Sequence, residues 1–279
     1  MNSLTEKQLR DVQLELLDKV NAFCEQRGIR YYLHAGTLLG AVRHQGYIPW
    51  DDDIDLVMFR EDYERFCREF SASLASEPAE PAALFSVNLR RDYGLPYAKV
   101  VDTRTQLVDE SRAWGEMGVF IDVFPLDAWP DGDRRSRIHR LRMAWRHGLA
   151  AVATATPNPN RSYRKALGMT ILGPLVRNVM SHRRLARGIE RAARAPKMDT
   201  ASMVGVTVFS RLQRVERDAY GNTSEVQFEG RRYPAPSDVH RVLECHYGDY
   251  MTLPPEEERI QGWHGIAVWS QINRSGGFD

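Results

Sequence analysis

Three aspartates stand where they could hold a metal ion: Asp53 and Asp55 lie close together, and Asp122 follows further along the chain. Asp53 and Asp55 open a run of apolar and β-branched residues that predicts a strand, and side chains two positions apart on a strand point the same way. Neighbouring carboxylates repel each other unless a cation lies between them, and an all-oxygen ligand set suits Mg²⁺ or Mn²⁺. Asp51 shares the parity of Asp53, whereas Asp52 should face away.

Asp122 strengthens this interpretation because it interrupts the apolar run from Val119 to Phe124, where a lone carboxylate would carry a heavy desolvation cost. We therefore predict that Asp53, Asp55 and Asp122 form a catalytic metal site. Such a site can bridge the phosphates of a donor, neutralise the leaving oxygen and help to ionise an attacking hydroxyl. The alternative is a solvated acidic turn in which Asp55 is only a helix cap or an ion-pair partner.

A Gly36-Thr37 turn just before a short helix, predicted over residues 38–43, could bind the phosphates of the donor. The free N–H groups and the dipole at a helix N-terminus favour phosphate, although such a dipeptide can also be a plain turn. Basic side chains near this point could hold phosphate oxygens or could be ordinary surface residues. The basic candidates are Arg43, His44 and Lys99. Our predicted donor-binding residues are Gly36, Thr37, Arg43 and Lys99.

These residues need a scaffold of mixed strands and helices. Apolar positions from Leu9 to Phe23 predict a first helix, with a capping box of Thr5 and Gln8 and a C-terminal Gly28. Strands are expected at residues 29–34, 53–58, 84–89, 97–101, 119–124 and 204–209. Helices are expected at 61–70 and from 236 to just before Gly248, and a hairpin near Gly221. The fold class is therefore α/β (α+β), a mixed sheet with flanking helices.

The length of 279 residues, 43% of them hydrophobic, suits one large domain with an insertion. We divide it into a catalytic core at 1–132, a basic helical insert at 133–197 and a C-terminal part of the same domain at 198–279. The 38 basic and 37 acidic side chains nearly cancel, with a formal net charge of +1, so the chain as a whole gives no argument for nucleic acid or membrane. No nucleic-acid partner is expected.

The insert differs from the rest of the chain in charge. Residues 133–194 hold fifteen Arg or Lys against two acids, a net charge of about +13. The apolar run 166–176 is flanked by basic residues that include Arg183, Arg184 and Arg187. This arrangement predicts peripheral contact with an anionic membrane, and the alternative is a helical pair packed on the core with a solvated basic face.

The cellular location follows from what the sequence lacks. The three cysteines are an odd number without CxxC spacing, which indicates a reducing compartment rather than a disulfide framework. Residues 1–10 are polar, and nowhere do about eighteen apolar residues run together. We expect a cytoplasmic protein that meets the inner face of the membrane.

Several blocks of the sequence closely resemble the signature of the LicD family, which includes bacterial phosphocholine transferases and fukutin-type ribitol-phosphate transferases. The matching blocks are AGTLLGAVRHQGYIPWDDDID at 35–55, REDY at 60–63, FIDVFPLD at 120–127, YPAP at 233–236 and YGDYMTLPP at 247–255. They lie in the family's order and span about residues 8 to 259. Residues 262–279 match no pattern.

The resemblance implies a nucleotidyltransferase-like fold in which Gly36-Thr37 is the phosphate-binding turn. It also implies that Asp53 and Asp55 are the paired metal ligands and Asp122 the third carboxylate. Family chemistry moves a phospho-alcohol from a CDP-activated alcohol donor to a sugar hydroxyl of a glycan or lipid-linked glycan acceptor and releases CMP. The C-terminal block could close the donor site or could be architectural.

Two other functions remain open on the sequence: a nucleotidyltransferase that uses an intact NTP, and a non-catalytic binding module. The transferred alcohol is also open. Choline would need aromatic rings around its quaternary ammonium, whereas ribitol or glycerol would need a polar pocket. The aromatic candidates, which could equally be packing residues, are Tyr47, Trp50, Trp114 and Trp129.

Overall fold

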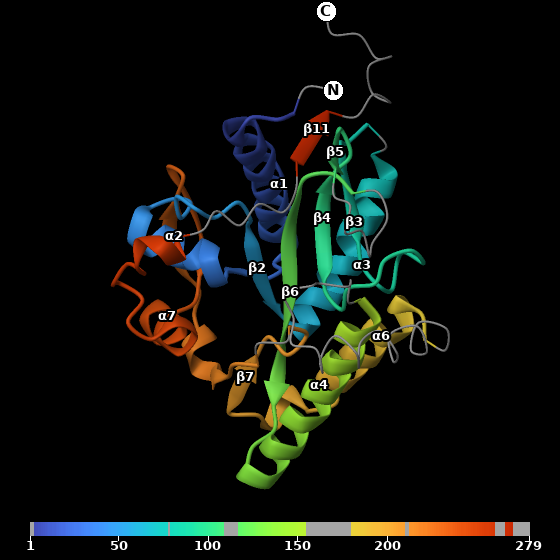
Figure 1. The fold of residues 1–279 in the computed structure, drawn as a ribbon, viewed down its shortest axis with the longest axis vertical. Coiled ribbons are helices and arrows are strands. Elements are labelled where there is room, and N and C mark those ends of the chain that lie inside the picture. The colour runs from blue at the N-terminus through green and yellow to red at the C-terminus, as the bar shows by residue number, and fades with distance from the viewer. Residues whose placement is uncertain are drawn as a thin grey trace, which may run out of the picture.

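The computed structural model describes residues 3–77, 79–108, 117–154, 180–209, 212–259 and 266–269 (Figure 1). Its helices are α1 (Glu6–Arg27), α2 (Ala35–His44), α3 (Arg60–Ser76), α4 (Asp133–Thr154), α6 (His182–Ala193) and α7 (Val239–Tyr247), with short 3₁₀ turns at Met198–Thr200, Arg217–Tyr220 and Glu256–Glu258. Its strands are β1 (Tyr32–Leu33), β2 (Asp55–Phe59), β3 (Ala82–Phe85), β4 (Ala98–Asp102), β5 (Thr105–Val108), β6 (Phe120–Trp129), β7 (Met203–Gly205), β8 (Val215–Glu216), β9 (Ser224–Phe228), β10 (Arg231–Ala235) and β11 (Ile266–Trp269).

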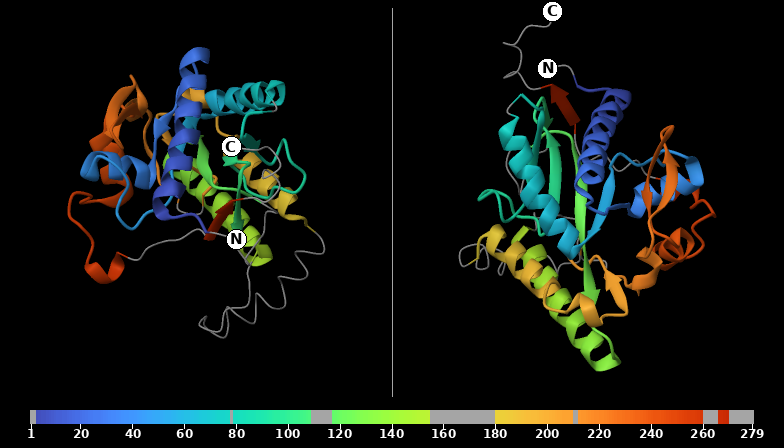
Figure 2. Two further views of the ribbon diagram at one scale, coloured as in Figure 1. Left: turned by 90° about the horizontal axis from the view of Figure 1, so that it is seen from above. Right: turned by 180° about the vertical axis from the view of Figure 1, so that it is seen from behind.

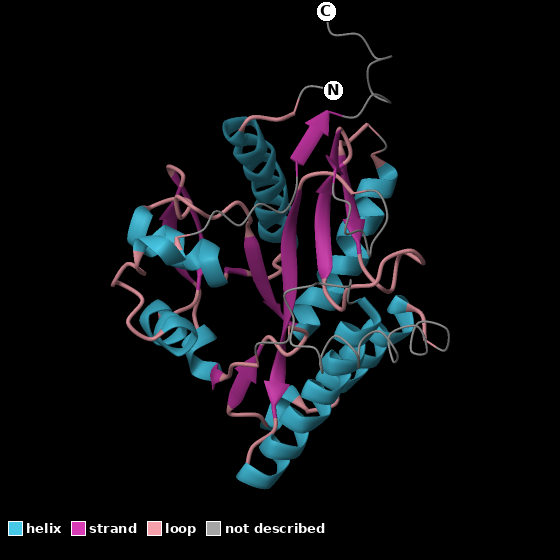
Figure 3. Ribbon diagram, in the orientation of Figure 1, coloured by secondary structure: helices cyan, strands magenta, loops and turns pink. Residues whose placement is uncertain are grey.

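The main sheet has the strand order β1-β2-β6-β4-β3. Strands β2 and β6 run parallel, whereas the β1–β2, β6–β4 and β4–β3 pairs are antiparallel. The long strand β6 continues past its partners, and its far end pairs with β7, which in turn pairs with β8 (Figure 3). A mixed sheet with flanking helices is the predicted fold class, which is thereby confirmed.

Helices α1 and α3 cover one face of this sheet, as the view from behind shows (Figure 2, right). The predicted capping box of Thr5 and Gln8 and the left-handed C-cap at Gly28 are both present in α1. The two helices meet through aromatic rings, with 5.0 Å between the ring centroids of Phe23 and Phe70. The buried stripe predicted for the first helix therefore faces the sheet.

The elements around the acidic residues begin at other positions than predicted. The strand expected at 53–58 starts only at Asp55, because residues 51–54 form the loop that leads into it. The helix expected at 38–43 starts at Ala35, so Gly36 and Thr37 lie in its first turn and not in a turn before it. The strand expected at 29–34 shortens to Tyr32–Leu33.

The C-terminal part also departs from the prediction at its hairpin. The hairpin expected near Gly221 turns instead at Glu229 and Gly230, both with positive φ, between β9 and β10. Helix α7 starts at Val239 with Asp238 as its N-cap, later than the predicted start at residue 236, and it ends just before Gly248, as predicted. The pairing of β5 with β11 was not predicted, because β11 lies in the stretch that matched no pattern.

Two helices of the basic insert pack against each other, α4 and α6, with the ring of His139 against Trp129 of β6 (5.2 Å between ring centroids). The apolar run 166–176 lies outside the described residues. Among the described helices, none is long and apolar enough to cross a membrane.

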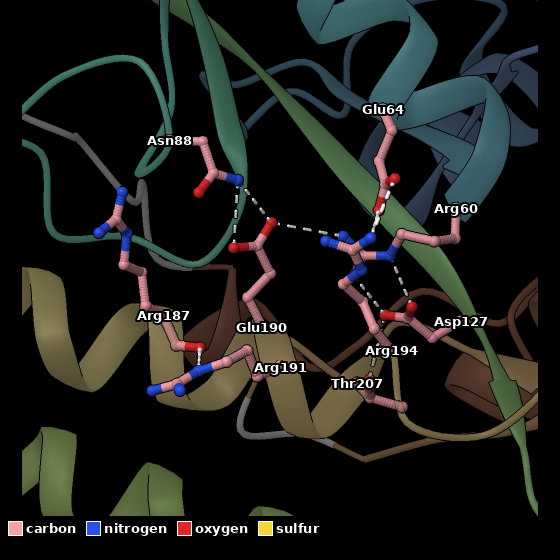
Figure 4. A network of polar contacts seen from close by, with 9 residues as sticks. All are labelled: Arg60, Glu64, Asn88, Asp127, Arg187, Glu190, Arg191, Arg194 and Thr207. Carbon is pink, nitrogen blue, oxygen red and sulfur yellow. Dashed lines mark hydrogen bonds and ion pairs between the residues drawn. The ribbon is translucent and has the colours of Figure 1, made fainter.

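A buried ionic network fastens α6 to the core (Figure 4). Arg60, at the start of α3, donates two hydrogen bonds of 2.8 Å to the carboxylate of Asp127 on β6. The same guanidinium lies 3.6 Å from Glu190 of α6, which also accepts a hydrogen bond of 3.1 Å from Asn88. Thr207 donates to Asp127 at 3.3 Å. One arginine therefore joins three elements, since its planar fork can serve two carboxylates at once.

We predict that Arg60→Met lowers the free energy of unfolding by about 3–5 kcal/mol, because two buried carboxylates lose their counter-ion. Urea unfolding measures this change. Arg68→Met is the matched control, since the Arg68 side chain is 70% exposed, and its effect should stay within about 0.5 kcal/mol. Equal stability of the two variants would show that the network is not what holds α6 in place.

Candidate functional site

Strand register brings three functional side chains together on one face of the sheet. Asp55 of β2 stands opposite Asp122 of β6, and Asp122 stands opposite Lys99 of β4. Lys99 and Asp122 form a buried ion pair, and the Lys99 ammonium lies 3.3 Å from the centre of the Phe120 ring. Burial lowers the pKa of Lys99, while Asp122 opposes that shift. The structure thus places a fixed positive charge among the carboxylates.

The acidic loop before β2 adds two more carboxylates to this cluster. Burial and the neighbouring Asp53 raise the pKa of Asp51 to about 7, and the two side chains share a hydrogen bond. Burial, then Asp53, Asp122 and Asp51, raise the pKa of Asp55 well above its ordinary value, and Lys99 offsets only part of this. The predicted Asp53, Asp55 and Asp122 are therefore neighbours, although Asp53 comes from the loop and not from the strand.

The start of α2 holds the cluster in position. The Thr37 hydroxyl accepts a hydrogen bond of 2.8 Å from the backbone N–H of Asp55. A Cβ atom at Gly36 would lie only 2.3 Å from a carboxylate oxygen of Asp51, so a larger residue there would displace that carboxylate. Gly36 and Thr37 were predicted to contact phosphate. In the structure these two residues hold the acidic loop against the start of α2.

Gln13 of α1 supports the loop from the other side and was missed by the sequence analysis. Its amide nitrogen donates a hydrogen bond of 2.7 Å to the backbone oxygen of Asp52, and its amide oxygen accepts one of 3.0 Å from the Tyr47 hydroxyl. A buried glutamine within an apolar helical stripe is the signal that could have identified it.

Two of the predicted phosphate ligands point elsewhere. Arg43 donates a hydrogen bond of 2.9 Å to the backbone oxygen of Tyr250 and another of 3.0 Å to the ring of His44. These contacts tie α2 to the C-terminal segment, so Arg43 and His44 are not brought to the carboxylates. Of the predicted basic residues, Lys99 alone joins the cluster.

A cavity of about 200 Å³ opens beside Asp55. Its lining includes His34, Phe124, Phe209, His246 and Tyr247. The rings of His34 and His246 meet edge to face at 5.0 Å, and burial together with His246 lowers the pKa of His34 well below its ordinary value. Burial therefore favours the neutral imidazole of His34, and its buried Nδ1 has no hydrogen-bond partner in the described structure.

None of the three described aromatic residues suggested by sequence lines the cavity beside Asp55. Tyr47 is buried under α1, Trp50 packs against Arg259, and Trp129 donates a hydrogen bond to Ser136. Trp114 lies outside the described residues. The cavity beside Asp55 is instead lined by aromatic residues that the sequence analysis did not select, because β6, the loop after β7 and α7 meet only in the folded chain.

The chemistry of the carboxylate cluster suits a hard cation. Its candidate ligand atoms are all oxygens, and its aspartates lie close enough together to raise the pKa of Asp51 and of Asp55. Within the described residues, however, no three His, Cys, Asp or Glu side chains are positioned to coordinate one ion. The residue types and their charge fit a metal ion, but in this structure Asp122 is paired with Lys99.

Comparison with known proteins agrees with the blocks seen in the sequence. Residues 28–133 match the family model "LicD/FKTN/FKRP, nucleotidyltransferase domain". The chain is 29% identical to the lipopolysaccharide cholinephosphotransferase LicD of Haemophilus influenzae over 93% of this chain and 96% of that protein. It is also 55% identical to human ribitol 5-phosphate transferase FKRP over 38 residues, which are 14% of this chain and 8% of that protein.

The matched domain spans α2, the acidic loop and strands β2, β4 and β6, which are the elements that build the carboxylate cluster. The similarity to the Haemophilus protein extends over nearly the whole chain, including the insert and the C-terminal part. Residues 28–133 of this chain are therefore a LicD-type nucleotidyltransferase domain, and similarity to a LicD protein extends along nearly the whole chain.

Proposed function

We propose that this protein transfers a phospho-alcohol from a CDP-activated alcohol to a hydroxyl of a glycan or of its lipid-linked precursor, with release of CMP. The activities for which the two relatives are named support a phospho-alcohol transferase. The observation that carries the proposal is the alignment of Asp55, Asp122 and Lys99 across three neighbouring strands, beside a cavity that Asp55 also lines. Phosphocholine is the first group to test, because the more extensively matched relative is named for it.

Asp53, Asp55 and Asp122 would hold a Mg²⁺ or Mn²⁺ ion, whose charge would offset that of the donor diphosphate and of the leaving CMP. The chain's own groups set the remaining chemistry. Lys99 adds a fixed positive charge next to the place where phosphate would bind. Asp122 can accept a hydrogen bond from the acceptor hydroxyl and draw its proton as the new bond forms.

The aromatic cavity would take the alcohol part of the donor. Phe124, Phe209 and Tyr247 present ring surface to it, and Asp55 closes one side. Ring faces and a carboxylate together favour a quaternary ammonium such as that of choline. A polyol would instead use the free Nδ1 of His34. A comparison of CDP-alcohol donors therefore shows whether the aromatic rings or His34 determines which alcohol is accepted.

Contact with an anionic membrane is a further part of this proposal. An acceptor built on a lipid is confined to the membrane surface, and a basic insert would keep the enzyme near it. Residues 133–194 hold the positive charge for such contact.

We expect CMP release when the protein, Mg²⁺ and a lipopolysaccharide acceptor are incubated with one of CDP-choline, CDP-ribitol or CDP-glycerol. The reaction should stop in excess EDTA and resume when Mg²⁺ is restored, because the surplus charge of the carboxylates and the diphosphate needs a cation. Chromatography of the nucleotide products measures the release. Full activity in EDTA, or consumption of an NTP with release of pyrophosphate, would contradict the proposal.

Asp53→Asn and Asp55→Asn should each lower turnover at least about a hundredfold, because the donor phosphates lose the charge that positions them. The melting temperature should not fall, since each change removes like-charge repulsion from the cluster. Asp218→Asn is a suitable control because that carboxylate is 77% exposed on a 3₁₀ turn. Near-normal turnover of the Asp55 variant would overturn the site assignment.

Asp122→Asn should remove activity and also destabilise the fold, by about 1–3 kcal/mol, because Lys99 loses its buried carboxylate partner. The double variant Asp122→Asn/Lys99→Met should regain much of that stability and stay inactive. Urea unfolding and the CMP assay separate the two effects. If Asp122→Asn were as stable as the wild type, the Lys99–Asp122 pair would not be a structural element of the site.

A further inference from the structure

Helix α4 carries a ridge of large apolar side chains on its open side. Ile138, Leu141 and Trp145 are 55%, 64% and 64% exposed. Their spacing of three and four residues puts them in one row along the helix. In a helix that only packs on the core and presents a solvated back, this row would be polar. Three exposed large apolar residues in register therefore mark a contact surface.

The opposite side of α4 packs against the core and α6, and this packing fixes the direction in which the ridge points. His139 and Met143 are buried, and the ring of His147 hydrogen-bonds the backbone oxygen of Thr207 at 3.0 Å. Gly188 of α6 lies so close to Arg146 that an added Cβ would be 2.8 Å from its guanidinium. The helix is thus anchored on one side by the core and α6, and the ridge faces away.

Arginines surround the ridge. At 100° per residue, Arg134 continues the row by one turn, while Arg137 and Arg142 flank it on its two sides. All three are exposed, and no carboxylate of the described part of the chain forms an ion pair with them. Arg135 and Arg140 on the same helix are also exposed. Asp133, at the first position of α4, is the one acidic residue of this helix, so the charge around the ridge is predominantly positive.

We propose that this ridge and its flanking arginines are a docking surface for anionic lipid membrane. The apolar side chains would enter the boundary between headgroups and acyl chains, where tryptophan is favoured, and the guanidinium groups would lie among the lipid phosphates. Charge complementarity selects the anionic membrane as the partner, and a membrane also offers an apolar interior to a row that includes the aliphatic Ile138 and Leu141.

The placement of α4 is compatible with work at a membrane. The helix starts beyond the carboxyl end of β6, whereas Asp122 lies near the start of that strand (Figure 1). Docking through α4 therefore leaves the carboxylate cluster uncovered. The proposal does not depend on which group the enzyme transfers, because vesicle binding is measured without donor or acceptor.

Helix α6 is a less suitable place for the contact and for its test. Arg183 was a sequence candidate for lipid binding, but its guanidinium donates a hydrogen bond of 3.0 Å to the backbone oxygen of Val87. A charge reversal at Arg183 would disturb the packing of α6 as well as any lipid contact. The α4 residues give a cleaner test, since their side chains have no such task.

The test is co-sedimentation of the whole protein with vesicles of phosphatidylglycerol and phosphatidylcholine. The wild type should bind these vesicles at low salt and dissociate from them at about 0.5 M salt. It should not bind vesicles of phosphatidylcholine alone. Arg134→Glu/Arg137→Glu/Arg142→Glu should weaken binding at least about tenfold. Arg68→Glu/Arg91→Glu/Arg232→Glu makes the same change in net charge elsewhere on the surface and should weaken binding far less.

The apolar contribution needs its own variants. Leu141→Ser/Trp145→Ser should weaken vesicle binding, while the control Met251→Ser/Leu253→Ser, at exposed apolar residues of the C-terminal segment, should not. The blue shift of tryptophan fluorescence on vesicle binding should shrink in Trp145→Phe, which keeps an apolar ring and continues to bind.

Three results would overturn the proposal. One is that the wild type stays in the supernatant at low salt. Another is equal binding by the α4 variants and their matched controls. The third is binding to soluble polyanions such as heparin or DNA without binding to anionic vesicles, which would assign the arginines to a different class of partner.

Discussion

The repulsion between carboxylates on neighbouring strands is the constraint that the rest of the described fold has to offset. Parallel pairing of β2 and β6 puts Asp55 beside Asp122, and the acidic loop brings Asp51 and Asp53 to the same place. Four acids this close cannot all be ionised cheaply. Lys99 pairs with Asp122 and offsets only part of the effect of this crowding on Asp55. We propose that the crowded carboxylates give the site an affinity for a cation and, through it, for a phosphorylated donor.

The residues around the cluster hold it against that repulsion. Thr37 binds the backbone at the start of β2, and Gln13 binds the loop from the side of α1. Further along the same strands, Arg60 joins Asp127 to Glu190 and so fixes the insert to the end of β6. Two of the sequence blocks, at 60–63 and 120–127, therefore meet through one ion pair. The family motifs therefore contain both the clustered carboxylates and residues whose contacts hold the surrounding elements in place.

Much of this could be predicted from local pattern. The Thr5 capping box, the strand after Asp53 and the carboxylate at Asp122 each have a signature within a few residues. The Lys99–Asp122 pair has none, because it depends on β4 lying next to β6, and strand order is a property of the whole sheet. The same holds for the cavity, whose walls include His34, Phe124 and His246 from distant parts of the chain.

Where prediction failed, tertiary contacts had overridden local preference. Gly36 and Thr37 look like a turn, yet they form the first turn of α2, since Asp51 packs against Gly36 and Asp55 binds Thr37. Arg43 was selected by its distance along the chain, and that distance gave no sign of its hydrogen bond to Tyr250. At both positions the tertiary contact could not be read from nearby sequence.

Direct titration without any substrate tests whether the carboxylate cluster binds a divalent cation. Mn²⁺ is added to the purified protein while the free ion is measured by electron paramagnetic resonance. We expect saturable binding that Mg²⁺ displaces, that is lost in Asp55→Asn, and that persists in Asp218→Asn. Unchanged Mn²⁺ binding in Asp55→Asn, or no saturable binding by the wild type, would contradict this expectation.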